Sequence, residues 1–155
     1  MPTEIERKFL IKPDLWKDIN PKKSVDIKQA YLSILSEKTI RVRVQGKKGF
    51  ITIKGKTTGI SRAEYEYNIP LKEALELITK FPENLIEKTR HYVYYSGNVW
   101  EVDEFKGANQ GLFIAEIELK SENQKFELPP WIDKEVTNDK RYYNSNLSQN
   151  PFNSF

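Results

Sequence analysis

The chain has no cysteine, a single histidine (His91) and no long hydrophobic run. Without cysteine there is no disulfide framework, no thiolate metal site and no cysteine nucleophile, a composition compatible with the cytoplasm. No apolar stretch approaches the roughly 20 residues that cross a bilayer, and the first residues are charged, so we expect neither a membrane protein nor a secretory signal. The 155 residues suit one domain over 1–155 with a core of its own.

Charge, by contrast, is abundant. The chain has 25 lysines and arginines and 22 aspartates and glutamates, for a net charge of +3. Acidic and basic residues are interleaved in the same segments, which is a poor surface for a nucleic-acid backbone. We therefore expect no nucleic-acid partner and look for chemistry in how the charges are arranged.

Short segments rich in Ile, Val, Tyr, Thr and Phe alternate with turn residues, which predicts strands. Tight turns such as 46–49 and 96–98 require neighbouring strands to run antiparallel. The eight predicted strands are 3–11, 25–35, 39–46, 49–56, 62–69, 87–96, 99–106 and 112–121.

Helical signals are fewer. Apolar residues at helical spacing between Pro70 and Pro82 predict one amphipathic helix. A short helical turn is expected at 14–19, and a last helix from Asn138 or Asp139 through Leu147. The composition of the final eight or so residues suggests a tail.

In seven of the strands charged residues alternate with other residues, so the charges share one face. These faces carry Glu4, Glu6 and Lys8; Arg41 and Arg43; Thr52, Lys54 and Lys56; Glu64 and Glu66; Lys88 and Arg90; Glu101 and Asp103; and Glu116, Glu118 and Lys120. A solvent-facing sheet would also alternate. However, most stripes have one sign, and the helices are too few to cover eight strands. We therefore predict an α+β, mainly β fold: a closed, antiparallel, eight-stranded β-barrel with a few flanking helices and the charges facing its lumen.

Such a lumen cannot be a dry core, because unpaired buried charges cost several kcal/mol each. Its arginines and lysines suit a compact polyanion, and the planar arginine fork matches phosphate oxygens. Its carboxylates, without histidine or cysteine, suit Mg²⁺ or Mn²⁺. A polyphosphate with a divalent metal would satisfy both sets.

This ordered series of stripes resembles the CYTH domain, also called the triphosphate tunnel metalloenzyme family, from Thr3 to about Leu147. The segment Trp131–Thr137 followed by Lys140-Arg141-Tyr142 is similar to the C-terminal signature of small bacterial members. The resemblance implies a tunnel-forming barrel and Mg²⁺- or Mn²⁺-dependent chemistry on triphosphates.

The resemblance also implies roles for individual residues. The glutamate pairs of the first and last stripes would bind metal and meet across the lumen, while Glu64 and Asp103 would complete a second metal site or orient basic neighbours. Tyr31 and Arg141 would add substrate contacts. His91 has the opposite parity to Lys88 and should point outside. The metal set is Glu4, Glu6, Glu64, Asp103, Glu116 and Glu118. The catalytic and phosphate-binding set is Lys8, Arg41, Arg43, Lys54, Lys88 and Arg90.

The predicted reaction is hydrolysis of a terminal phosphoanhydride. No insertion obviously builds an adenine or thiamine pocket, which favours inorganic tripolyphosphate as substrate. Class IV adenylate cyclase and thiamine or nucleoside triphosphatase remain alternatives, as does a non-catalytic polyphosphate-binding module. Whether the chain forms a homodimer is left open.

Overall fold

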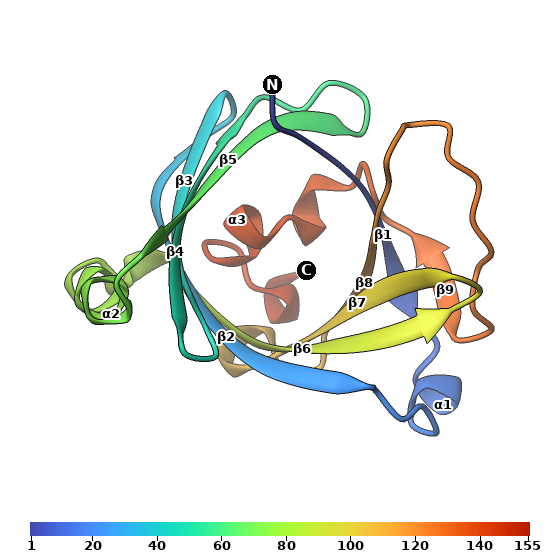
Figure 1. The fold of residues 1–155 in the computed structure, drawn as a ribbon. Helices are drawn as coiled ribbons and strands as arrows, with labels where there is room; N and C mark the ends of the chain where they lie inside the picture. The colour runs from blue at the N-terminus through green and yellow to red at the C-terminus, as the bar shows by residue number, and fades with distance from the viewer.

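The computed structural model describes residues 1–155 and contains the predicted closed β-barrel (Figure 1). Around the barrel the strands follow the order β5-β4-β3-β2-β6-β7-β8-β1, and β1 pairs with β5 to close the ring. Every pairing is antiparallel. The eight strands are β1 (Thr3–Ile11), β2 (Lys23–Leu35), β3 (Lys38–Gln45), β4 (Lys48–Gly55), β5 (Ser61–Ile69), β6 (Leu85–Tyr95), β7 (Asn98–Phe105) and β8 (Phe113–Glu118). The predicted fold class is confirmed, with strand ends shifted by up to three residues.

A ninth strand, β9 (Ile132–Glu135), was not predicted. It pairs with the end of β1, opposite Phe9 and Ile11, and lies outside the ring. Three of its four residues are charged, so it carries no apolar alternation that would indicate a strand. Its backbone joins the sheet because β1, after pairing with β5 and β8, leaves its last residues without another partner.

The predicted amphipathic helix is α2 (Leu71–Lys80), and the turn after Pro13 is α1 (Pro13–Trp16). The single closing helix is wrong: a 3₁₀ turn, η3 (Lys140–Tyr142), and a short helix, α3 (Asn144–Leu147), are separated by Tyr143 in extended conformation. Asp139 does cap this region, since its side chain accepts a hydrogen bond from the Arg141 N–H. The remaining 3₁₀ turns are η1 (Pro82–Asn84), η2 (Gly107–Asn109) and η4 (Phe152–Ser154).

Much of the hydrophobic core lies outside the barrel wall, because the alternate face of each strand points away from the lumen. Ala74 and Ile78 of α2 cover Ala30 and Val42 on the outer face of β2 and β3. A larger cluster packs the outer faces of β1, β6, β7 and β8 against the chain between β8 and β9. Trp16, Trp100 and Trp131 meet in it edge to face.

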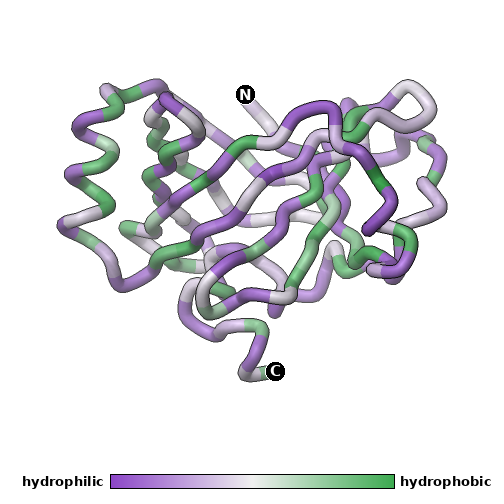
Figure 2. Tube along the Cα trace, turned by 90° about the horizontal axis from the view of Figure 1, so that it is seen from below, coloured by the Kyte–Doolittle hydropathy of each residue, from purple (hydrophilic) through white to green (hydrophobic).

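The C-terminal segment closes one end of the barrel. α3 lies inside the ring in Figure 1, and in the perpendicular view of Figure 2 the chain end extends beyond the strands on that side. Leu147 is fully buried with Phe105 and Leu112, and the Phe152 N–H donates to Asn109 Oδ1 at 2.8 Å. The closing residues, where the composition suggests a tail, therefore contact the barrel end. None of the helices has the length and apolar composition to cross a membrane.

Candidate active site in the barrel lumen

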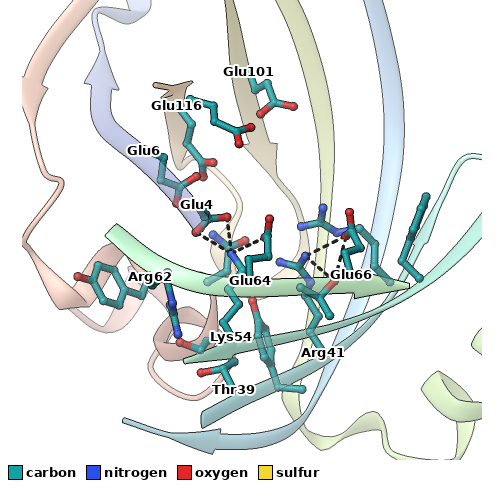
Figure 3. A pocket seen from close by; sticks show the side chains of 18 of the residues that line it. Glu4, Glu6, Thr39, Arg41, Lys54, Arg62, Glu64, Glu66, Glu101 and Glu116 are labelled. Carbon is teal, nitrogen blue, oxygen red and sulfur yellow. Dashed lines mark hydrogen bonds and ion pairs between the residues drawn. The ribbon is translucent and has the colours of Figure 1, made fainter. Parts of the chain in front are cut away.

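The lumen holds a cavity of about 360 Å³. Of its 22 lining residues only Tyr31, Phe50 and Tyr143 are hydrophobic. The charged faces of the strands therefore turn inward, as the alternation predicts (Figure 3). Seven acidic and seven basic residues line it: Glu4, Glu6, Glu64, Glu66, Glu101, Glu116 and Glu118, with Lys8, Arg41, Arg43, Lys54, Arg62, Lys88 and Arg90.

Carboxylates gather on one side of the cavity, on β1, β7 and β8. The β1 and β8 glutamates do not meet across the lumen as expected; they lie on adjacent strands, where Glu6 is directly opposite Glu118, and Lys8 is opposite Glu116. The reason is the closure of the barrel, which makes the first and last strands neighbours. We call Glu4, Glu6, Glu101, Glu116 and Glu118 the acidic side.

Negative charge is in excess on the acidic side. Burial raises the pKa of Glu116, and the nearby Glu6 carboxylate raises it further. Burial, Glu4 and Glu64 likewise raise the pKa of Glu118. Burial opposes the charge of Lys8, yet Glu6, Glu116 and Glu4 together raise its pKa above the ordinary value.

This acidic side suits a divalent cation. The donors are all carboxylate oxygens, which Mg²⁺ and Mn²⁺ prefer, and a bound cation would offset the charge that raises the two glutamate pKa values. No three carboxylates already converge on one point. Some of these side chains would therefore have to move to complete a coordination shell.

Positive charge is in excess on β3 and β6, the two strands that flank β2 in the ring, and we call this part of the lining the basic wall; β6 adjoins β7 of the acidic side. Burial and the neighbouring Arg41 and Arg90 lower the pKa of Arg43 to about 9. Burial, with Arg90 and Arg43, lowers the pKa of Lys88 to about 7 despite Asp103. Arg41 Nε is buried without a hydrogen-bond partner. Buried cations whose charge is not fully offset mark a place for an anion.

Asp103 does not line the cavity, and a metal-binding role does not fit its geometry. The carboxylate is fully buried and accepts from Lys88 Nζ at 2.7 Å, Arg90 Nε at 2.8 Å and Arg90 Nη2 at 2.9 Å. Although burial alone would raise the pKa of Asp103, Arg90 and Lys88 hold it below the ordinary range. The structure thus favours the other predicted role, in which Asp103 orients the two cations.

Replacing Asp103 with asparagine should destabilise the fold. The change leaves two buried cations without their shared counter-ion, and breaking a buried charge pair costs about 3 to 5 kcal/mol. Urea unfolding at pH 7 should show this loss, whereas Asp133→Asn, on an exposed residue of β9, should leave the midpoint unchanged. Because the pKa of Asp103 is lowered in the fold, the stabilisation is present above the ordinary aspartate pKa and lost as pH falls below it. The difference in unfolding free energy between wild type and variant should therefore decrease at acidic pH.

Ion pairs link the acidic and basic residues within the cavity. Lys54 Nζ lies 2.8 Å from Glu4 Oε2 and 3.4 Å from Glu64 Oε2. Arg41 Nη2 lies 3.7 Å from Glu66, and Arg90 Nη1 lies 3.2 Å from Glu101. Glu66 and Glu101 make the last two of these bridges and also line the cavity.

The structure does not place Arg141 at the cavity, where the resemblance implies a substrate contact. Its side chain is 58% exposed, hydrogen-bonds Asp139 and does not line the cavity. The next turn instead brings Tyr143 to the cavity, with its ring 5.3 Å from Lys8 Nζ. Tyr31 does line the cavity. His91 points outside, where it contacts Ser24 and Glu104.

Several lining residues were not predicted. Arg62 and Thr39 share the parity of Glu64 and Arg41, so extending the alternation by one step would have found them. Tyr143, Asn144 and Ser145 lie outside any strand, and no periodicity places them near the lumen. The others are Gln45 and Phe50, whereas Thr52 belongs to the inward face predicted for its strand.

The comparison with known families agrees with this geometry. The CYTH domain model matches residues 2–149. The chain belongs to the CYTH domain family. A curated relative from Acetivibrio thermocellus, named inorganic triphosphatase, is 49% identical over 156 residues, covering 100% of this chain and 99% of that protein. A second relative of that name, from Nitrosomonas europaea, is 38% identical and covers 94% of this chain and 97% of its own.

A solved structure also matches this CYTH domain over its length. It is a crystal structure of an inorganic triphosphatase, 35% identical, with a TM-score of 0.67. The match covers 96% of this chain and 95% of that one.

Proposed function

We propose that this CYTH protein hydrolyses inorganic tripolyphosphate with the help of Mg²⁺ or Mn²⁺. One observation carries the proposal: a single cavity brings seven basic and seven acidic side chains together, with excess positive charge on β3 and β6 and excess negative charge on β1 and β8. The excess positive charge suits a triphosphate, and the excess negative charge suits its metal ion. The full-length relatives named inorganic triphosphatase support the same activity.

In this proposal the basic wall binds and orients the phosphates. Arg41 and Arg43 on β3, with Lys88 and Arg90 on β6, face the same cavity and supply charge that offsets the negative charge of the transition state. Lys8 and Lys54 reach the phosphates from β1 and β4. Asp103 holds Lys88 and Arg90 in place by its three hydrogen bonds.

The acidic side would hold the metal, through Glu4, Glu6, Glu116 and Glu118, with Glu64 close to Lys54. When bound, a divalent cation supplies charge stabilisation on the phosphate oxygens. A carboxylate of the acidic side would orient the attacking water and accept its proton. As the water oxygen bonds to the terminal phosphorus, the bridging P–O bond breaks, so tripolyphosphate yields phosphate and pyrophosphate.

The lining of the cavity favours an inorganic substrate over a nucleotide or thiamine ester. A nucleobase or a thiazolium ring needs an apolar, aromatic surface, and only three of the 22 lining residues are hydrophobic. The carboxylates disfavour a metal-free polyphosphate-binding module, because they would repel an anion that arrives without a cation.

The test is to incubate the protein separately with tripolyphosphate, ATP and thiamine triphosphate. Each reaction contains Mg²⁺ or Mn²⁺, or EDTA, and is followed for phosphate, pyrophosphate and cyclic AMP. We expect fastest phosphate release from tripolyphosphate and none with EDTA. Cyclic AMP as the main product would contradict hydrolysis, and tight binding of tripolyphosphate without turnover would identify a binding module.

A further inference from the structure

Lys54 occupies an unusual place in the cavity. Its ammonium projects from β4 and lies between Glu4 on β1 and Glu64 on β5 (Figure 3). It donates to both oxygens of Glu4, at 2.8 and 3.0 Å, and lies 3.4 Å from Glu64 Oε2. The side chains of Lys54 and Glu4 are only 15% and 11% exposed. Water therefore screens this contact little.

The contact also spans the junction at which the barrel closes. Strands β1 and β5 share only three residue pairs, Thr3↔Ala63, Glu4↔Arg62 and Ile5↔Ser61, whereas β3 and β4 share eight. Lys54 on β4 therefore adds a charged link between the two strands that close the ring. A ligand that draws Glu4 or Lys54 away must replace this link.

Lys54 differs in this from Arg41 and Arg90, which also pair with glutamates of the cavity. Arg41 also donates to Thr52 Oγ1, and Arg90 is held by two hydrogen bonds to Asp103, so each keeps a polar partner when its cavity glutamate is drawn away. The ammonium of Lys54 contacts only the two carboxylates. Losing them would leave a nearly buried cation unpaired, which is strongly unfavourable.

The binding of a metal alone, or of a polyphosphate alone, is therefore weakened by the loss of this ion pair. A cation that binds Glu4 leaves Lys54 without a counter-ion, and an anion that binds Lys54 leaves Glu4 without one. When both bind together, Glu4 binds the metal and Lys54 binds a phosphate, so every charge keeps a partner. The exchange of partners links the two binding events.

We propose that Lys54 is an internal counter-ion that holds Glu4 and Glu64 until metal and triphosphate bind as a pair. The inference rests on the proposed function, since it takes the ligands to be a divalent metal and a triphosphate. Part of the mutual increase in their affinities then comes from Lys54, and the effect is reciprocal. Removing Lys54 should strengthen the binding of metal alone, although it removes a phosphate-binding residue.

The experiment measures Mn²⁺ binding from the electron paramagnetic resonance signal of free Mn²⁺, without any phosphate present. Lys54→Met should lower the Kd for Mn²⁺ by about fivefold or more, a typical size for coupling between two sites. Lys56→Met is the matched control, because Lys56 lies two residues away, is exposed and makes no ion pair. Arg62→Met removes a charge that lines the same cavity but donates to the Gly55 carbonyl and not to a carboxylate.

An unchanged Kd in Lys54→Met would overturn the proposal. An equal gain in Arg62→Met would also overturn it, because the effect would then reflect overall charge and not the release of Glu4. Should the methionine variant fail to fold, Lys54→Gln removes the charge and keeps a hydrogen-bond donor for Glu4, and the same shift is expected.

A second measurement uses imidotriphosphate, a non-hydrolysable triphosphate analogue, in titration calorimetry with and without Mn²⁺. The factor by which Mn²⁺ strengthens analogue binding should be smaller in Lys54→Met than in wild type, after correction for Mn²⁺ binding to the free analogue. An equal factor would contradict the proposal. These readouts do not depend on turnover, so a wild type that fails to hydrolyse tripolyphosphate would refute the proposed function without deciding the role of Lys54.

Discussion

Glu116→Gln is expected to lower kcat/KM for tripolyphosphate at least about 1,000-fold while leaving the fold intact. Glu116 is buried on the acidic side, 3.8 Å from Lys8 and 4.0 Å from Arg90. In the proposed mechanism it helps hold the metal, whose charge stabilisation is worth several kcal/mol, and each 1.36 kcal/mol corresponds to about a factor of ten. Glutamine keeps the shape of the side chain and removes its charge.

The measurement is initial velocity over a range of Mn²⁺ concentrations, beside Mn²⁺ binding to the free protein. Both metal affinity and turnover should fall, and the thermal midpoint should change little, because burial and Glu6 already disfavour the Glu116 charge. Glu87→Gln is the control: Glu87 is exposed on β6, outside the cavity, and contacts Lys28 at 3.8 Å. Turnover within tenfold of wild type at saturating Mn²⁺ would contradict the metal assignment of Glu116.

Arg43→Met should abolish most activity without weakening the fold. Burial and the charges of Arg41 and Arg90 already disfavour the guanidinium, so its removal relieves repulsion and offsets the lost hydrogen bond to Gln29 Oε1 at 2.8 Å. With substrate bound, the same charge is expected to stabilise the transition state. Removing one such donor typically costs about 100- to 1,000-fold in kcat.

Thermal unfolding and steady-state kinetics separate these two effects. We expect a midpoint equal to or above that of wild type, together with the loss of kcat. Arg141→Met is the matched control, since Arg141 is exposed and bonded to Asp139 outside the cavity, and it should retain full activity. A marked fall in stability of Arg43→Met would show that the guanidinium supports the fold, contrary to the charge excess inferred on this wall. Loss of activity in Arg141→Met would instead support a contact between Arg141 and the substrate.

Most of the cavity-lining residues on the strands are predicted by the alternation of charged and other residues along each strand. A strand of period two places Glu4, Glu6 and Lys8 on one face whatever lies around it, and the same holds for Arg41 and Arg43. Because the helices are too few to cover an open sheet, the sequence predicts that the strands close into a barrel. The alternation then predicts which side of each strand lines the cavity. Arg62 was missed only because the alternation on β5 was not extended to its first residues.

The C-terminal region was harder to predict because its structure depends on what it packs against. Tyr143 is extended between η3 and α3, which breaks the predicted helix. Neither the break nor the 3₁₀ turn has a local periodic signal. Arg141 was assigned to the substrate from a resemblance in sequence, and it points away because Asp139, two residues earlier, holds its guanidinium.

The sequence by itself determined the barrel and the inward charged faces, because alternation is a local property of each strand. Only the tertiary structure decided how the charges pair. Closure of the barrel places Glu6 beside Glu118 and brings Lys54 to Glu4, although 50 residues separate them in the chain. The register of β6 and β7 places Asp103 opposite Arg90, where it is buried between Lys88 and Arg90, away from the cavity. Ion pairing falls off with distance and depends on burial, so strand register and ring closure decide which charges remain free for ligands.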